Sequence, residues 1–321
     1  MDLGTITKIW DSILQMSAPH PLICLFFFPG GLFLILAALL YEWADRKLVA
    51  RFQNRVGPRV FQPVADMLKL LVKEEVIPKS VNRSLFIVLP IISFACVMTA
   101  SLYVPMFGVE APIGLHGDLI ITMYLLSVMT MCLGMAGANS MNRFAVVGAT
   151  RTFTQLFAYE APFMLALLMP AISAQSWNIN VISEYASAHT WMIATIPIGI
   201  IISVIGLMGK LELAPFDAPE AESEIVSGAL SEYSGRGWGL FRIAKDVELV
   251  IGISLIVTFY LGGFGNLVSF LLKSLGLLII IALLQSSMTR LRIDQTVGFW
   301  WQAGAILSLI QLMILILVRI L

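Results

Sequence analysis

The stretch SLFIVLPIISFACVMTASLYVPM, residues 84–106, decides the fold class because it contains no charged side chain. A helix of about 20 mostly apolar residues crosses the hydrocarbon core of a bilayer. Arg83 precedes the stretch and Glu110 follows it. Of all 321 residues, 59% are hydrophobic and only 12% are charged, which is too little charge to cover the surface of a soluble domain. We therefore expect an integral membrane protein.

Apolar segments of similar length lie on both sides of this stretch. With it, the expected spans are 21–42, 84–106, 117–138, 154–175, 191–211, 243–263, 266–285 and 298–318. The predicted fold is an all-α, polytopic membrane protein with about eight transmembrane helices plus amphipathic interfacial helices, in a single membrane domain over residues 1–321. Residues 1–20 have apolar side chains at helical spacing and predict an amphipathic segment at the interface.

Basic residues are distributed unevenly among the loops. Most of the 20 Lys and Arg residues follow the first, third, fifth and seventh spans, whereas the loops near 110–118 and 184–189 contain none. Loops rich in Lys and Arg stay in the cytoplasm. We expect the large loops to be cytoplasmic and both termini to lie outside.

The first cytoplasmic loop, 44–83, is basic. Between residues 61 and 76, apolar residues fall on one helical face, whereas Gln62, Asp66, Lys69 and Lys73 fall on the other. This pattern predicts an amphipathic interfacial helix. Its basic residues suit lipid phosphates or an acidic surface of a partner protein, and both interpretations stay open.

The other large loop, 212–242, is acidic. A helix that begins near Pro219 would place Glu220 and Glu224 one turn apart, with Asp217 beside them. Repulsion between carboxylates raises the pKa of at least one of them, which suits proton exchange. The alternative is that acids in a first helical turn complement the helix dipole.

Ionisable residues inside the spans are few. Glu160, two residues before Pro162, predicts an ion or proton path because a carboxylate inside a bilayer is costly. The alternative is an ion pair with Arg151 near the surface. Lys273 either extends its amine to the outer interface or serves an intramembrane relay.

Metal and catalytic motifs are not evident. The three cysteines and three histidines are not spaced as metal ligands, and nucleophile or phosphate-loop motifs are lacking. We expect no metal, cofactor or catalytic residue in this chain, so that any electron transfer takes place in partner subunits.

Three segments resemble, in order, the first cytoplasmic loop, the fourth-span motif and the acidic-loop signature of the NADH dehydrogenase subunit 1 family, the membrane anchor subunits of complex I. They are EWADRKLVARFQNRVGPRVFQPVADMLKLLVKEEVIP (42–78), TQLFAYEAPFMLA (154–166) and LAPFDAPEAESEIVSGALSEYSG (213–235). The resemblance implies a non-redox membrane subunit of an oxidoreductase complex in a prokaryotic cell membrane. Such a protein anchors soluble subunits, including an iron–sulfur subunit, beside antiporter-like membrane subunits, and links electron transfer to H⁺ or Na⁺ movement. No nucleic acid is implied.

The resemblance also assigns roles to residues that match the family's motifs. For docking the soluble arm they are Arg46, Arg55 and Lys69; for ion coupling they are Glu160, Asp217, Glu220, Glu222 and Glu224. Asp246 and Glu248, with Lys273, are candidates for an intramembrane relay.

One departure bears on the branch of the family. Where quinone-reducing members usually have Ala-Glu-Tyr, this chain has Ala244-Lys245-Asp246. The change resembles the M subunit of archaeal membrane-bound [NiFe] hydrogenases, in which the iron–sulfur clusters and the [NiFe] centre belong to partner subunits. The alternatives are a quinone-site subunit of an NAD(P)H, ferredoxin or F420H2 dehydrogenase, and a stand-alone ion transporter.

Overall fold

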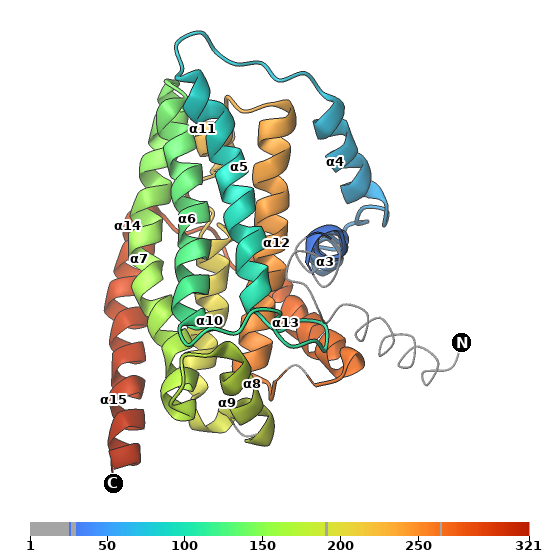
Figure 1. Ribbon diagram of the computed structural model, residues 1–321. Helices are drawn as coiled ribbons and strands as arrows, with labels where there is room; N and C mark the ends of the chain where they lie inside the picture. Colours follow the sequence, from blue (N-terminus) through green and yellow to red (C-terminus); the bar gives the residue numbers. More distant parts are fainter. Residues whose placement is uncertain (1–25, 27–29, 190–191, 264, 321) are drawn as a thin grey trace, which may run out of the picture.

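A computed structural model describes residue 26 and residues 30–189, 192–263 and 265–320, which form helices joined by turns and loops (Figure 1). The described residues contain one isolated antiparallel bridge, between Met106 and Val109, and no sheet. The all-α class is confirmed. The amphipathic segment expected at 1–20 lies outside the described residues.

Helices overlap each of the expected spans, but the first of them, Gly31–Phe52, continues ten residues beyond the expected end of the first span, into the expected loop 44–83. They are α3 (Gly31–Phe52), α5 (Arg83–Ala100) with the 3₁₀ turn η1 (Ser101–Tyr103), α6 (Asp118–Asn139), α7 (Arg143–Ala174), α9 (Met192–Thr195), α10 (Pro197–Lys210), α12 (Gly235–Tyr260), α13 (Leu267–Ser287), and the run α14 (Ile293–Phe299), η3 (Trp300–Ala305) and α15 (Ile306–Ile320). The loops contain α4 (Gln62–Val72), α8 (Ile179–Ala188), α11 (Glu222–Ile225) and η2 (Gly228–Leu230).

Among the described residues, five helical segments are long and apolar enough to cross a membrane: 83–103, 118–139, 143–174, 267–287 and 293–318. The other expected spans correspond to α3, α10 and α12. The helix α10 has only 14 residues, fewer than the roughly 20 that a complete crossing needs. Both α3 and α12 contain several charged residues. The count of eight spans therefore stays a prediction.

The helix α12 lies at the centre of the bundle. All its residues from Val247 to Tyr260 are buried, and it packs against α3, α4, α5 and α10. Near its middle, Arg242, Lys245 and Asp246 are partly buried and Glu248 is fully buried, whereas Arg236 at its start is exposed. Because buried charges require partners, this helix organises the polar interior of the fold.

Other helices make contacts beside both internal prolines of α7, and at Pro170 the contact replaces a lost hydrogen bond. Pro170 has no N–H to donate to the carbonyl of Ala166, and the hydroxyl of Tyr260 donates to that carbonyl instead, at 2.5 Å. Beside the other internal proline, Pro162, the segment η3 is π-helical and places the Trp300 ring 6.5 Å from that of Tyr159. Both contacts tie α7 to neighbouring helices.

The predicted amphipathic helix of the first loop is α4, shorter than expected because Lys73 is extended. Pro63, Met67 and Leu70 form its buried side, and the helix packs against α12. Phe61 and Leu68, on the expected apolar face, are exposed. The helix thus retains an apolar surface for a membrane or a partner.

Candidate functional site

The candidate site is a row of acidic and basic side chains, which we call the charged row. Its outer part joins α3, α4 and α12. Glu42 and Arg46 lie one turn apart on α3 and form an ion pair. Arg46 lies 3.6 Å from Asp66 of α4, and Arg242 of α12 donates a hydrogen bond to Glu42 at 2.8 Å.

A cavity of about 480 Å³ adjoins this outer part. It is lined by Glu42, Asp45, Arg46, Leu211, Glu212, Leu213, Glu220, Leu230, Trp238, Arg242, Lys245, Asp246, Leu249 and Gln285. Buried oxygen atoms of Asp45 and Gln285 have no hydrogen-bond partner in the described part of the chain, and the carboxyl groups of Glu42 and Asp246 lie close enough to share a hydrogen bond. Oxygen atoms in such positions readily bind protons or water molecules.

Lys245 joins two carboxylates on the far side of this cavity. Its amine lies 2.6 Å from Glu212 and 2.5 Å from Glu220. Thr152 of α7 also donates to Glu212, at 3.4 Å. Burial raises the pKa of Glu212, and the positive charge of Lys245 opposes that rise.

The inner part of the row reaches α7. The amine of Lys210 lies 3.4 Å from a carboxylate oxygen of Glu248, and both side chains are almost fully buried. Lys210 also lies 5.8 Å above the ring of Tyr159. A small cavity is lined by Lys210, Tyr159, Glu160 and Ser127, and Ser127 donates a hydrogen bond to Glu160. The row therefore extends from the surface helix α4 to the carboxylate predicted in the fourth span.

The acidic loop differs from the prediction. A helix beginning near Pro219, with Glu220 and Glu224 stacked, is wrong: α11 has only four residues, and Ala221 before it has a left-handed φ of 30°. The two acids separate because each has a different cation. Glu220 binds Lys245, whereas Glu224 accepts from Arg151 at 2.7 Å. The side chain of Glu222 lies outside the described part.

A second ion-pair group, which we call the loop pairs, holds this loop against α7 and against the segment 288–292 that precedes α14. Arg290 lies 3.2 Å from Asp217 and 3.6 Å from Glu224. Burial raises the pKa of Asp217, although Arg290 opposes it. A hydrogen bond from Arg151 lowers the pKa of the exposed Glu224. The loop therefore contains a carboxyl of raised pKa, but burial rather than stacking is the main cause.

The remaining sequence candidates lie apart from one another. Glu160 is not paired with Arg151, because Arg151 binds Glu224. Lys273 donates to the carbonyls of Gly262 and Gly263 at 3.3 Å each, and so stabilises the turn after α12. Arg55 and Lys69 are exposed and do not belong to the charged row. Of the docking candidates, Arg46 alone joins the row.

Sequence reasoning missed Glu42, Arg242, Lys245, Glu212 and Lys210 as members of the site. A signal for some of them was present. Charged residues recur three and four positions apart on α3 (Glu42, Asp45, Arg46) and on α12 (Arg242, Lys245, Asp246). Such spacing puts each group on one helical face and predicts facing charged stripes.

The fold and the site define a helical membrane subunit with paired acids and bases between its helices. A profile of the family described as NADH dehydrogenase matches residues 26–316. One relative, the H subunit of NADH-quinone oxidoreductase from Dehalococcoides mccartyi (strain CBDB1), is 32% identical over 293 residues, which cover 88% of this chain and 82% of that protein. The protein of the same name from Carboxydothermus hydrogenoformans is 34% identical over 285 residues, 84% and 81% of the two chains. This chain belongs to the NADH dehydrogenase family of membrane subunits.

A solved structure has the same fold. It is a chain of the "membrane-bound sulfane sulfur reductase (MBS), an archaeal respiratory membrane complex", with a TM-score of 0.81 and 23% identity, covering 88% of this chain and 96% of that one. Together with the NADH-quinone oxidoreductase relatives, this makes the chain a membrane-embedded subunit of a complex I-like oxidoreductase complex.

Proposed function

We propose that this chain is the membrane anchor and coupling subunit of a complex I-like, membrane-bound [NiFe] hydrogenase. In this role it holds the soluble redox arm and links electron transfer to the movement of H⁺ or Na⁺. The charged row supports the proposal, because it extends from the surface residue Asp66 to Glu160 within the expected fourth span. Alternating acids and bases in a low-dielectric interior suit proton transfer.

The redox centres belong to partner subunits in this proposal. Among the described residues, no group of three or more His, Cys, Asp or Glu is arranged to hold a metal ion. The proposal assigns the iron–sulfur clusters and the [NiFe] centre to soluble partners, and it assigns antiporter-like membrane subunits to the ion path. The large loops face the cytoplasm of a prokaryotic cell, and the termini face outward.

The lining of the cavity supports the hydrogenase branch over a quinone branch. Small-molecule sites are mostly apolar with a few polar groups. Here most lining residues are charged or polar, and Trp238 is the one aromatic residue among them. Lys245 forms two ion pairs in this cavity. It belongs to the segment Ala244-Lys245-Asp246, which stands where quinone-reducing members usually have Ala-Glu-Tyr. An apolar quinone would have to displace or bury these charges, which is costly.

The surface of α4 supports docking of a soluble partner. Its exposed side presents Lys69 beside Phe61 and Leu68, which is a mixture of charge and apolar area. Protein interfaces combine an apolar centre with a polar rim. We assign this surface, together with Arg55 in the connection between α3 and α4, to the partner that holds the iron–sulfur cluster.

A quinone-site subunit is the second candidate. The names of the relatives and the 480 Å³ volume of the cavity favour it. A stand-alone ion transporter would exchange ions as an isolated chain in vesicles, and the membership of the relatives in multisubunit complexes favours a coupling role instead.

The test is to purify the complex through an affinity tag on this chain, in mild detergent, and to measure nickel content and hydrogen evolution. We expect a stoichiometric nickel-binding partner and hydrogen evolution that is insensitive to quinone-site ligands. A nickel-free complex that reduces a quinone would contradict the hydrogenase proposal and establish the second candidate.

A further inference from the structure

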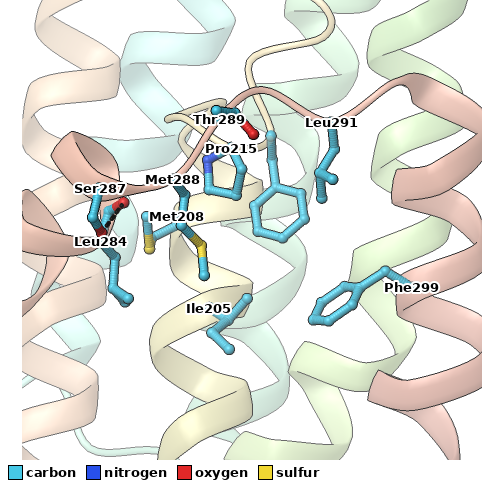
Figure 2. Close-up of a pocket in the computed structure, with 10 residues that line it drawn as sticks. Ile205, Met208, Pro215, Leu284, Ser287, Met288, Thr289, Leu291 and Phe299 are labelled. Carbon is cyan, nitrogen blue, oxygen red and sulfur yellow. Dashed lines mark hydrogen bonds between the residues drawn. The ribbon is translucent and has the colours of Figure 1, made fainter.

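An apolar cavity of about 460 Å³, which we call the chain pocket, lies apart from the charged row (Figure 2). Three helices end or begin around it: α10 ends at Lys210, α13 ends at Ser287 and α14 begins at Ile293. The pocket is lined by Ile205, Met208, Pro215, Phe216, Leu284, Ser287, Met288, Thr289, Leu291 and Phe299. In Figure 2, Leu284 and Ser287 of α13 lie at the left, Phe299 lies at the right, and Ile205 of α10 lies below Pro215.

The lining of the chain pocket favours a hydrocarbon over a polar ligand. Ser287 and Thr289 are its polar residues, and the Ser287 hydroxyl already donates to the carbonyl of Leu283 at 2.8 Å. A polar group placed inside would lose its hydrogen bonds to water without replacement, whereas an alkyl chain gains by leaving water. The volume falls within the roughly 300–1,000 Å³ of small-molecule sites.

The chain pocket opens on the apolar outer surface of the protein. Of its lining residues, Ser287, Met288, Thr289 and Phe299 are exposed, and the two large ones are apolar. The outer face of α13 beside it exposes Ile279, Ile280 and Leu283, and α15 likewise exposes a row of Ile, Leu and Met side chains. In a membrane subunit such surfaces contact lipid chains, which can therefore reach the pocket from the side.

A basic residue stands at the rim of the chain pocket. Arg292 directly follows the lining residue Leu291 and is exposed. Its charge helps to lower the pKa of Glu224, but it forms no salt bridge within 4.0 Å among the described residues. The neighbouring Arg290 is already bound to Asp217 and Glu224. The rim lies at the basic end of the bundle, where helices end at the membrane interface and anionic head groups gather beside Lys and Arg.

We propose that the chain pocket holds one hydrocarbon chain of an anionic membrane phospholipid, whose phosphate group binds Arg292. The lipid braces the acidic loop, since the pocket wall includes Pro215 and Phe216 of that loop. The carbonyl of Pro215 accepts from the N–H of Leu291 at 3.0 Å, and that of Phe216 accepts from Gln155 at 2.7 Å. This inference is independent of the electron acceptor of the complex.

The test uses the intact complex in phosphatidylcholine vesicles that contain a small fraction of phosphatidylglycerol with a photoreactive diazirine on one acyl chain. After illumination, cross-linked peptides are mapped by mass spectrometry. We expect cross-links within 205–216 and 284–299. Leu284→Trp fills the pocket and should lower this labelling about tenfold. Leu283→Trp is the matched control, because Leu283 is the adjacent, exposed residue outside the lining, and should leave the labelling unchanged.

A second pair of variants tests the head group. Arg292→Gln should reduce the preference for phosphatidylglycerol over a diazirine phosphatidylcholine about fivefold, the effect of one basic residue near an anionic surface. The control is Arg143→Gln, because Arg143 is an exposed arginine at the start of α7, and this variant should keep the preference for phosphatidylglycerol unchanged. If Leu284→Trp prevents assembly, Ile205→Phe serves as the filling variant. The proposal would be overturned if the pocket-filling variant were labelled as strongly as the wild type. It would also be overturned if both lipids labelled the wild type equally, or if a helix of a partner subunit were cross-linked in the pocket.

Discussion

Two groups of ion pairs in this chain use the same residue types in different surroundings. In the charged row, Lys210 and Glu248 have side chains only 3% and 1% exposed. In the loop pairs, Arg151 and Glu224 are 26% and 53% exposed. Water screens the second pair, so that it contributes little to stability, whereas the first pair depends on both partners being present.

The difference bears on the proposed ion-coupling role, which can be tested separately in each group. A buried ion pair is a poor means of stabilising a protein, because an apolar pair of similar volume often does as well. The proposed ion-coupling role accounts for a buried pair of this kind in the row that reaches Glu160. The loop pairs hold a surface loop in place, a task for which exposed pairs are sufficient. Substitutions in each group separate these two roles.

The largest effect is expected for Lys210→Met. The substitution leaves the Glu248 carboxylate buried without its cation, which should destabilise the chain by about 3–5 kcal/mol. The measurement is the fraction of the chain assembled in the complex and the temperature at which the complex inactivates. The double variant Lys210→Met/Glu248→Met should recover assembly but not ion translocation. Translocation at the wild-type rate in the double variant would remove these residues from the ion path.

Glu160→Gln should have a large effect on coupling and a small one on assembly. The amide keeps a hydrogen-bonding group beside Ser127 but cannot exchange a proton, so that ion translocation should fall by roughly a hundredfold or more. Translocation is measured in vesicles alongside the redox activity of the complex. Glu184→Gln, an exposed carboxylate in α8, is the control and should behave as wild type. Undiminished translocation in Glu160→Gln would contradict the ion-coupling role.

Asp217 and Glu224 should give the acidic loop opposite responses to pH. Because the folded protein raises the pKa of Asp217, the contribution of this residue to stability is greatest below about pH 4 and declines as pH rises through its raised pKa. The pKa of Glu224 is lowered, so its contribution is present above about pH 4 and is lost as pH falls through its lowered pKa. The measurement is hydrogen exchange of the loop amides at pH values below and above about 4, which follows the contributions of Asp217 and Glu224. Asp217→Asn should remove the first response alone.

The smallest effect is expected for Glu224→Gln. The side chain is exposed, and Asp217 still binds Arg290 after the substitution. Assembly and ion translocation should stay at wild-type levels, with faster hydrogen exchange confined to the loop. A loss of translocation comparable to that of Glu160→Gln would place Glu224 in the ion path and end the distinction between the two groups.

Much of the helical arrangement could be predicted from uncharged runs of sequence, and Glu160 stood out because it is a lone acid inside such a run. The charged row could not be predicted as a unit. Its ion pair between Glu42 and Arg242 joins residues 200 positions apart, and their contact depends on how α3 packs against α12. The helix expected at Pro219 failed for a related reason: Lys245 and Arg151 lie on different helices and bind Glu220 and Glu224 separately. Local propensity contains no information about such partners.

The π-helical turn η3 has a consequence for the length of the last helix. A π turn contains one residue more than the α turn it replaces. Deleting one residue within 300–305 would therefore leave an ordinary α-helix. The side chains of α14 and α15 would keep their present directions. Deleting one residue farther along, in α15, would rotate the remainder of the helix by about 100° and turn its outer face inward. Related chains that differ by a single residue in this helix should have gained or lost it at Trp300–Ala305.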